Sequence, residues 1–314
     1  KMISKTSKIF ITGHNGLVGS ALVKKLYKLG FTKIITANRL KLDLRDQVKV
    51  FKFFKKHKPN YVINAAAKVG GIYSNNKYPA DFLYDNLQIQ NNVIYACFKF
   101  KVKDLVFLGS SCIYPKMCRQ PIKENYLLSG KLEKTNEAYA IAKIAGIKLC
   151  EKFNEQFKTG YKCLMPSNSY GPNDNYHELN SHFLPALIRK IYEAKTKKKD
   201  HIILWGTGKP KREMIYVDDL ADACIFFLGK KTKHYLINIG SGKDMKILEY
   251  AKLIMKILDS KLKIKYDKSK PDGTLRKILN IQLAKSYGWQ PSTSLRKGLE
   301  MTINDFVENY QNLR

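Results

Sequence analysis

The chain has 314 residues, of which 44% are hydrophobic, and its 57 Lys and Arg against 26 Asp and Glu give a formal net charge of +31 at pH 7. This length can bury a substantial core, either in one large domain or in a large domain with a smaller one. No run approaches the ~20 apolar residues that a membrane span needs, and none suggests a signal peptide. We therefore expect a cytoplasmic protein without membrane contact.

The positive charge is spread along the whole sequence, and its tightest cluster is the short run 195–199. A nucleic-acid-binding protein would instead concentrate basic residues in a patch or stripe. We therefore expect a solvated basic surface that attracts anionic ligands, and no nucleic-acid partner. The six cysteines include no C-x-x-C pair, which argues against both a metal site and a disulfide framework.

Short apolar runs alternate with longer amphipathic segments through the first half of the chain. The pattern predicts strands at 9–12, 33–36, 61–64, 105–108 and 161–165, and helices at about 17–29, 48–56 and 138–157. Short buried strands separated by helices are typical of βαβ units and a parallel sheet. We predict an α/β fold in which residues 1–165 form a Rossmann-type, doubly wound parallel sheet.

The alternation fades after Pro166, where prolines, glycines and polar turns become frequent. We expect residues 166–314 to form mainly a smaller C-terminal α/β lobe that binds substrate. Apolar segments at 217–220 and 235–239 look like elements that rejoin the sheet or link the lobes. Segments near 214–240 are therefore expected to return to the Rossmann domain.

The first turn fits G-x-x-G-x-x-G directly between a predicted strand and a predicted helix. Glycines at this spacing allow a tight turn and close approach of the backbone to a pyrophosphate, which the helix N-terminus favours. We predict a dinucleotide site there, formed by Gly13, His14, Asn15, Gly16, Leu17, Val18 and Gly19.

The residue that selects between dinucleotides lies about 20 positions beyond the last glycine. An acidic residue there would favour NAD, but this chain has Asn38 and Arg39. Since Arg39 can pair with a 2′-phosphate, we predict NADP. Asp43, followed by Leu44, is placed to meet the adenine amine from the next loop.

Tyr139 and Lys143 are four residues apart on a predicted helix, so they share one face. A neighbouring ammonium is expected to lower the pKa of the tyrosine, which is ordinarily near ~10. Ser110 follows a predicted strand some thirty residues earlier. Together the three residues resemble the catalytic set of extended short-chain dehydrogenases/reductases.

Longer segments give a closer resemblance, to the GDP-L-fucose synthase family of NADPH-dependent GDP-4-keto-6-deoxy-D-mannose 3,5-epimerase/4-reductases. The resemblance runs from about Ile9 to the C-terminal region and lies in segments 65–72, 76–81, 109–115, 139–150 and 270–274. It implies that Cys112 and His182 are the base and the acid of an epimerisation that a simple reductase does not need. From the residues alone, the structural interpretation is the more common one for both side chains.

The resemblance also implies further contacts. Substrate binding is expected from Lys190, Trp205, Arg212 and Asp272. Besides the glycine turn, Arg39, Asp43 and Leu44, NADP is expected to contact Leu108, Gly109, Ser110, Ser111, Lys143, Pro166, Ser167, Asn168, Ser169 and His182. Two long helices, around 82–99 and 138–157, are expected to build a homodimer. Asn15 stands where some relatives carry a basic residue, which would weaken the preference for NADPH.

Other functions remain open at this point. A different extended short-chain enzyme, such as a nucleotide-sugar 4-epimerase or reductase, would need neither Cys112 nor His182. An NAD-dependent one would normally carry an acidic residue near position 38 or 39. A binding or scaffold protein would be expected to lack one of Ser110, Tyr139 and Lys143, and all three are present.

Overall fold

A six-stranded parallel sheet organises the first half of the chain. The computed structural model describes residues 3–177, 180–270 and 272–312. The strands lie in the order β2-β1-β3-β4-β5-β9. Their bounds are β1 Ile9–Thr12, β2 Ile34–Ile35, β3 Tyr61–Asn64, β4 Asp104–Leu108, β5 Lys162–Pro166 and β9 Leu236–Ile239. The predicted doubly wound α/β fold is confirmed, and the predicted strands lie within two residues of the observed ones.

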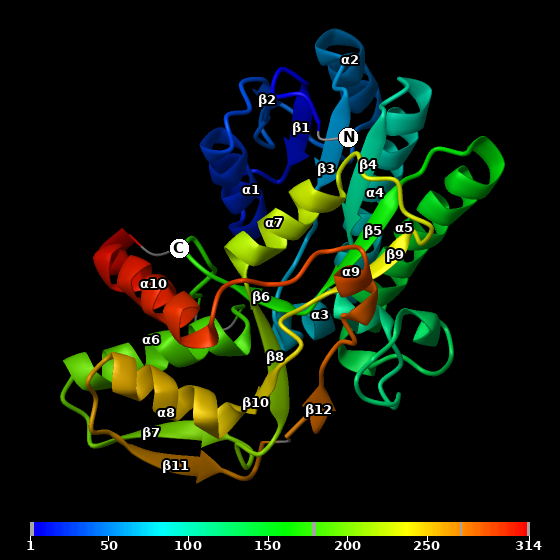
Figure 1. Cartoon of the computed structure of the whole chain (residues 1–314). Coiled ribbons are helices and arrows are strands. Elements are labelled where there is room, and N and C mark those ends of the chain that lie inside the picture. The colour runs from blue at the N-terminus through cyan, green and yellow to red at the C-terminus, as the bar shows by residue number, and fades with distance from the viewer. Residues whose placement is uncertain (1–2, 178–179, 271, 313–314) are drawn as a thin grey trace.

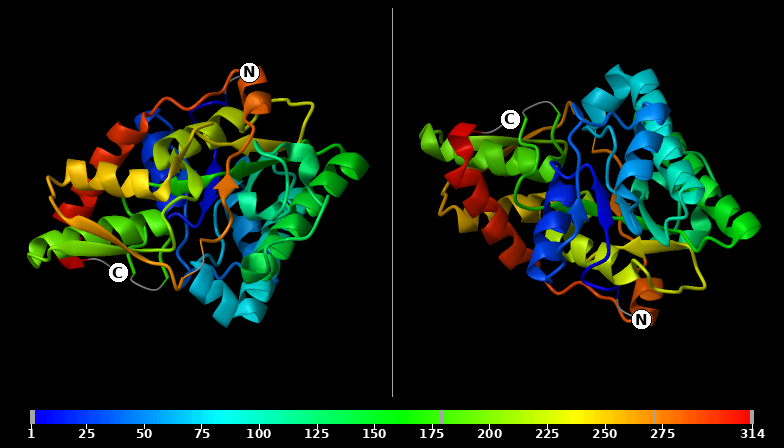
Figure 2. Two further views of the ribbon diagram at one scale, coloured as in Figure 1. Left: turned by 90° about the horizontal axis from the view of Figure 1, so that it is seen from below. Right: turned by 90° about the horizontal axis from the view of Figure 1, so that it is seen from above.

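Helices cover both faces of this sheet because its strands carry apolar side chains on both sides. Ile9 and Ile11 pack beneath α1 (Leu17–Lys28) and α7 (Val217–Phe227). Phe10 points to the opposite face, where α2 (Gln47–His57), α4 (Pro79–Lys99) and α5 (Glu137–Phe157) lie. Figure 1 shows the two helix layers, and Figure 2 shows them from below and above.

The second half of the chain builds smaller sheets beside the main one. The order β10-β8-β12 joins Asp244–Lys246, Lys211–Tyr216 and Arg276–Lys277, and β6 (Asn168–Tyr170) also pairs with β8. A separate parallel pair joins β7 (His201–Trp205) and β11 (Lys263–Asp267). The helices here are α6 Phe183–Thr196, α8 Ile247–Ile257, α9 Gln282–Ser286 and α10 Leu295–Glu308.

The chain crosses between these parts more than once. The segment after β8 forms α7, which packs beside α1, and β9 then pairs with β5 in the main sheet. Short elements complete the connections, namely α3 Ile72–Lys77, η1 Ser111–Ile113, η2 Glu124–Tyr126, η3 Lys134–Asn136 and η4 Tyr310–Asn312.

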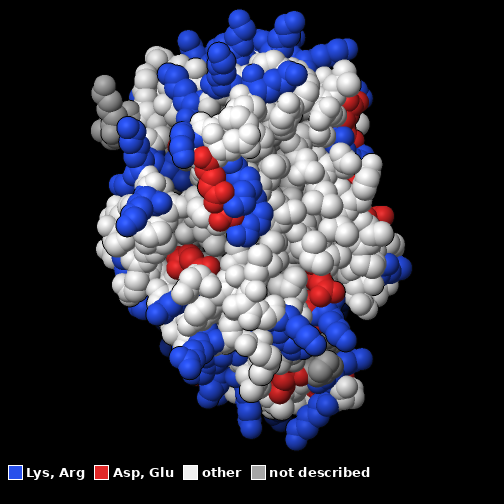
Figure 3. Space-filling view, turned by 90° about the vertical axis from the view of Figure 1, so that its right-hand side faces the viewer, with Lys and Arg blue, Asp and Glu red and all other residues white. Residues whose placement is uncertain are grey.

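Basic side chains gather along the upper and lower parts of the face drawn in Figure 3, around a broad area with few charges, and a few acidic ones lie among them. The upper edge of this view is densely basic where α2, α4 and α5 end. Positive charge there complements the negative ends of the helix dipoles. Within the described residues, no helix is long and apolar enough to cross a bilayer, and no three His, Cys, Asp or Glu side chains gather as a metal site.

A buried ion pair lies at the amino-terminal edge of the sheet. The Lys162 ammonium is 2.5 Å from a carboxylate oxygen of Asp104, and both side chains are less than a tenth exposed. The same oxygen accepts a hydrogen bond from the backbone N–H of Gly229 at 2.6 Å. Burial raises the pKa of Asp104, and the charge and hydrogen bond of Lys162 oppose that rise. The pair therefore ties two neighbouring strands to the turn after α7.

We predict that Asp104→Asn lowers the free energy of unfolding by about 3 kcal/mol, because it leaves the Lys162 ammonium buried without its counter-ion. Urea denaturation followed by circular dichroism measures this. The control is Glu155→Gln, which removes the exposed partner of Lys152 and should change stability by less than ~0.5 kcal/mol. Equal effects of the two substitutions would contradict the prediction.

Candidate functional site

The glycine turn between β1 and α1 brings backbone amides to the carboxyl edge of the sheet. Gly13 has φ +69°, and a Cβ there would lie 2.9 Å from the Cα of Ala66. A Cβ on Gly19 would lie only 2.0 Å from the carbonyl oxygen of Gly13. Gly16 precedes α1 without a side-chain cap, so the first amides of the helix can donate to an anion. The turn therefore fits a dinucleotide pyrophosphate.

The other residues predicted for this turn have different surroundings. Leu17 and Val18 pack against the core under α1, so their side chains serve the fold. His14 is half-buried, and Asn15 is exposed. The carbonyl of Asn15 accepts a hydrogen bond from the Asn173 side chain at 3.2 Å, which links the turn to the second half of the chain.

Arg39 and Asp43 lie in the loop after β2. The Arg45 guanidinium donates to the Asp43 carboxylate, with Nη2 and Oδ2 2.7 Å apart, and this bonding lowers the pKa of Asp43 to about 2. These bonds occupy oxygens that the adenine amine was expected to use. The Arg39 side chain is 72% exposed, and its Nε lies 3.8 Å from Asp43. Arg39 can therefore reach an added phosphate, while Leu44 packs against the core.

The residues after β4 are held close to the end of β5. A Cβ on Gly109 would lie 2.1 Å from the Met165 methyl group, so only glycine fits there without rearrangement. Ser110 caps the start of η1, and its Oγ accepts a hydrogen bond from the Cys112 backbone N–H at 3.4 Å. Cys112 is only 7% exposed. Burial raises the pKa of its thiol, while the charges of Lys277 and Lys143 oppose that rise.

Tyr139 and Lys143 lie in the first half of α5, which packs against η1. The Lys143 ammonium donates to the carbonyl oxygen of Leu108 at 2.8 Å, and burial lowers its pKa to about 8. Burial, with a smaller effect of Cys112, raises the pKa of Tyr139. Burial therefore outweighs the lowering of the Tyr139 pKa that was expected from Lys143, whose ammonium donates to the strand and lies 5.8 Å from the centre of the tyrosine ring.

His182 immediately precedes α6. Solvent reaches its side chain, yet enough protein surrounds the imidazole to lower its pKa, and the positive charge of Lys277 lowers it further. Asn180, two residues before it, is bonded to the segment that leads into α3, because its carbonyl accepts a hydrogen bond from the Gly71 N–H at 3.1 Å. The Oγ of Ser74 lies 2.5 Å from the side-chain oxygen of Asn180.

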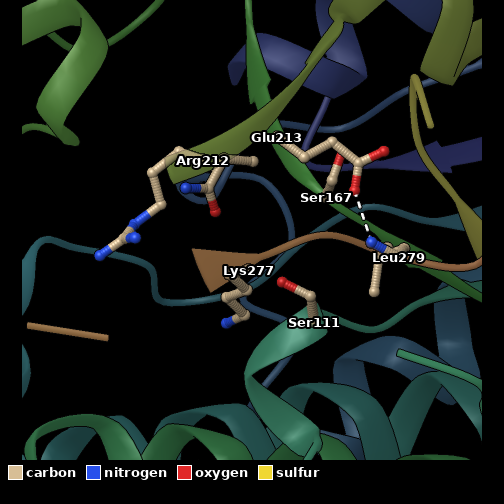
Figure 4. Close-up of a pocket in the computed structure, with 7 residues that line it drawn as sticks. Ser111, Ser167, Arg212, Glu213, Lys277 and Leu279 are labelled. Atoms are coloured by element: carbon tan, nitrogen blue, oxygen red, sulfur yellow. Dashed lines mark hydrogen bonds between the residues drawn. The ribbon is translucent and has the colours of Figure 1, made fainter. Parts of the chain in front are cut away.

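Lys277 is the site residue that the sequence analysis missed. It lies on β12 opposite Arg212 on β8, and both line a small cavity with Ser111, Ser167 and Asn168 (Figure 4). Its charge acts on both Cys112 and His182. In the sequence, Lys277 is one of 57 basic residues, and the only signal that could have singled it out is its position three residues after segment 270–274. The predicted segment 166–169 runs from β5 into β6, and the Ser167 N–H donates to Ile239.

The predicted substrate residues lie on the smaller sheets. Trp205 is 66% exposed at the end of β7, and the ammonium groups of Lys190 and Lys270 lie 5.7 and 5.8 Å from its ring. Arg212 donates to the carbonyl oxygen of Thr274 at 2.6 Å. Asp272 accepts from both the N–H and the hydroxyl of Thr207, so its carboxylate holds the turn after β7.

Comparison with known proteins gives close matches along the whole chain. Residues 9–240 match the NAD dependent epimerase/dehydratase family. The chain is 51% identical to GDP-L-fucose synthase 1 of Arabidopsis thaliana, covering 99% of this chain and 96% of that protein. It is 45% identical to GDP-L-fucose synthase of Escherichia coli strain K12, covering 98% of each. A solved GDP-L-fucose synthetase of Naegleria fowleri bound to NADP is 27% identical, with a TM-score of 0.90 over 100% of this chain and 98% of that one.

We predict that Gly19→Ala and Gly16→Ala differ in their effects on the turn. A Cβ on Gly19 would overlap the Gly13 carbonyl, so Gly19→Ala should lower both the unfolding temperature and dinucleotide affinity. A Cβ on Gly16 would lie 3.5 Å from that oxygen, so Gly16→Ala should keep the fold and mainly weaken binding. Thermal unfolding and fluorescence titration with NADPH measure the two effects, and an unchanged affinity in both variants would contradict the assignment.

Proposed function

The chain belongs to the GDP-L-fucose synthases within the NAD dependent epimerase/dehydratase family, and from this membership we propose how its own residues carry the reaction. The protein is an NADPH-dependent epimerase and reductase that converts GDP-4-keto-6-deoxy-D-mannose to GDP-L-fucose. One observation carries this conclusion, namely 45–51% identity to GDP-L-fucose synthases over nearly the whole chain.

The epimerisation needs a base and an acid on opposite faces of the sugar ring. The 4-keto group acidifies the protons on C3 and C5, because loss of either gives an enolate with its charge on the 4-oxygen. We assign removal of the proton to Cys112 and return of a proton to the other face to His182. Ser110 and Tyr139 would donate hydrogen bonds to the enolate oxygen, as an oxyanion hole does.

The reduction uses the same oxygen. When bound, NADPH supplies the hydride that C4 receives. We assign to Tyr139 the donation of its phenolic proton to the 4-oxygen. Lys143, with a pKa lowered to about 8, is well matched to stabilise the resulting tyrosinate and return a proton to it. Ser110 would keep the oxygen in place through both steps.

Lys277 adds a positive charge that acts on both epimerisation groups. This charge favours the thiolate of Cys112, which is the basic form, and it disfavours the protonated form of His182. A protonated His182 beside Lys277 therefore gives up its proton more readily. We infer that Lys277 assists both proton transfers.

The smaller sheets supply groups suited to a sugar nucleotide. The exposed ring of Trp205, flanked by Lys190 and Lys270, offers a stacking surface for the base. The Arg212 guanidinium matches diphosphate oxygens. We propose that residues 166–314 mainly bind the sugar nucleotide and residues 1–165 the dinucleotide, with 214–240 returning to the first lobe.

We also propose a homodimer in the cytoplasm. Helices α4 and α5 pack against each other, and they leave large apolar side chains exposed, including Tyr84 at 62%, Tyr95 at 41% and Ile141 at 44%. A second copy of the same helix pair would cover them in a four-helix contact. All six cysteines are free, which suits a reducing compartment.

We predict that Cys112→Ser separates the two chemistries. Serine keeps the size of the side chain, but a hydroxyl ionises far less readily than a thiol, so proton removal should slow at least about tenfold at neutral pH. With NADP⁺ and GDP-4-keto-6-deoxy-D-mannose in deuterium oxide, the unmodified enzyme should exchange deuterium into C3 and C5. Mass spectrometry should find much less label with the variant.

The control is the oxidation of GDP-L-fucose by NADP⁺, which requires hydride transfer at C4 without epimerisation. Cys112→Ser should form NADPH in this reaction at close to the normal rate, because Ser110, Tyr139 and Lys143 are unchanged. A variant that exchanges deuterium at the normal rate would leave the epimerase base unassigned.

Cofactor choice gives a separate prediction. If Arg39 binds the 2′-phosphate, Arg39→Ala should weaken NADPH binding about 10- to 100-fold, through loss of a charge-assisted contact, and leave NADH binding nearly unchanged. Fluorescence titration with each dinucleotide measures this. Equal affinities for NADPH and NADH in the unmodified protein would refute the role of Arg39.

A further inference from the structure

Glu213 is a buried carboxylate that joins two separate segments beside the site. Its side chain, on β8, is 2% exposed. One oxygen accepts a hydrogen bond from the N–H of Gly242 at 2.7 Å, and the other accepts from the N–H of Leu279 at 2.8 Å. A Cβ on Gly240 would lie 2.2 Å from the first oxygen, so the chain after β9 passes directly against this carboxylate. Figure 4 shows the bond to Leu279 at the border of the cavity.

The segment that Glu213 holds is the one that carries Lys277. Strand β12 consists of only Arg276 and Lys277, so its own pairing with β8 is short. The next residues are fixed by the backbone of Ile122, which bonds Ile278 and Asn280 at 2.8 Å each, and by two side chains. The Gln120 side chain accepts from the N–H of Ile278 at 2.9 Å, and Glu213 accepts from the following N–H, that of Leu279. The position of the Lys277 ammonium therefore depends on bonds made just beyond it.

A carboxylate is required for this arrangement, because both of its oxygens act as acceptors of backbone N–H groups. Burial raises the pKa of Glu213 to about 7, and the nearby Asp244 carboxylate adds to the rise. Protonation would turn one oxygen into a donor and leave one buried N–H without its acceptor. The titratable and charged groups that interact electrostatically with Lys277 are Cys112, Cys118, Glu133, Arg212 and His182.

We propose that Glu213 is a positioning residue for the epimerisation: by fixing Leu279 and the turn at Gly242, it holds Lys277 where its charge acts on Cys112 and His182. The proposal rests on the proposed function of Cys112 as the base. It assigns Glu213 no part in hydride transfer, since Ser110, Tyr139 and Lys143 are carried by β4, η1 and α5, which the carboxylate does not bind.

The test compares Glu213→Gln with Glu124→Gln in the full-length enzyme. Glutamine keeps the shape but offers one acceptor and one donor, so one of the two N–H groups loses its partner. Glu124 is a matched control, because it is also partly buried and accepts the Asn238 N–H of β9 at 2.9 Å. With NADP⁺ bound, we expect Glu213→Gln to slow deuterium exchange into C3 and C5 about tenfold at pH 7. The increase of the exchange rate with pH should also shift to higher pH. Glu124→Gln should leave the exchange unchanged.

Two further measurements separate positioning from general damage. Oxidation of GDP-L-fucose by NADP⁺ should stay within about twofold in Glu213→Gln. In a Lys277→Met background, adding Glu213→Gln should cause no further loss of exchange, because its effect passes through Lys277. If Glu213→Gln does not fold, Glu213→Asp, which keeps the charge and draws the oxygens back, takes its place with the same expected selectivity.

Several outcomes would overturn the proposal. They are normal exchange with an unshifted pH profile, an equal loss of exchange and oxidation, an equal effect of Glu124→Gln, or full additivity with Lys277→Met. Failure of the proposed function would look different. In that case Cys112→Ser itself would exchange deuterium at the normal rate, whatever the result for Glu213.

Discussion

The parallel direction of the main sheet is the constraint on which the site depends. Because β1, β3, β4, β5 and β9 run the same way, their carboxyl ends meet at one edge, and the loops that leave them come together. The order β2-β1-β3 places the point where the winding direction changes between β1 and β3. The glycine turn lies there, against Ala66. Ser110 and Cys112, which we assign to the chemistry on the sugar, come directly after β4, the neighbour of β3 in the sheet.

Close packing under this edge gives the reacting groups fixed positions. Met165 packs against Gly109. The Lys143 ammonium donates a hydrogen bond to the carbonyl oxygen of Leu108, at the end of β4. These contacts join neighbouring strands and α5 into one unit. The proposed acid, His182, and the proposed substrate-binding groups come instead from segments of the second half of the chain, which includes β6, β8 and β12. In the proposed mechanism, reduction thus relies mainly on the first unit, and epimerisation relies on both.

Local patterns in the sequence were sufficient to predict the main sheet, its helices and the glycine turn. Strands such as Ile9–Thr12 and the four-residue spacing of Tyr139 and Lys143 depend on neighbours in the chain. Lys277 and Glu213 could not be predicted in this way, because their roles depend on the pairing of β12 with β8, some 65 residues apart. The spacing of Tyr139 and Lys143 also could not show that the ammonium binds the Leu108 carbonyl, or that burial raises the pKa of Tyr139 where a lowering was expected.

The excess of basic side chains on the surface affects the steps before chemistry begins. Both substrates, NADPH and a sugar joined to GDP, are polyanions, and a protein with a net charge of +31 draws such molecules toward itself from a distance. This attraction raises the rate at which the substrates encounter the protein. It weakens as dissolved ions shorten the range of the electric field, to ~8 Å near physiological salt. The surface thus makes substrate capture depend on the ionic strength of the surrounding medium, while Cys112 and Lys143 lie buried beneath that surface.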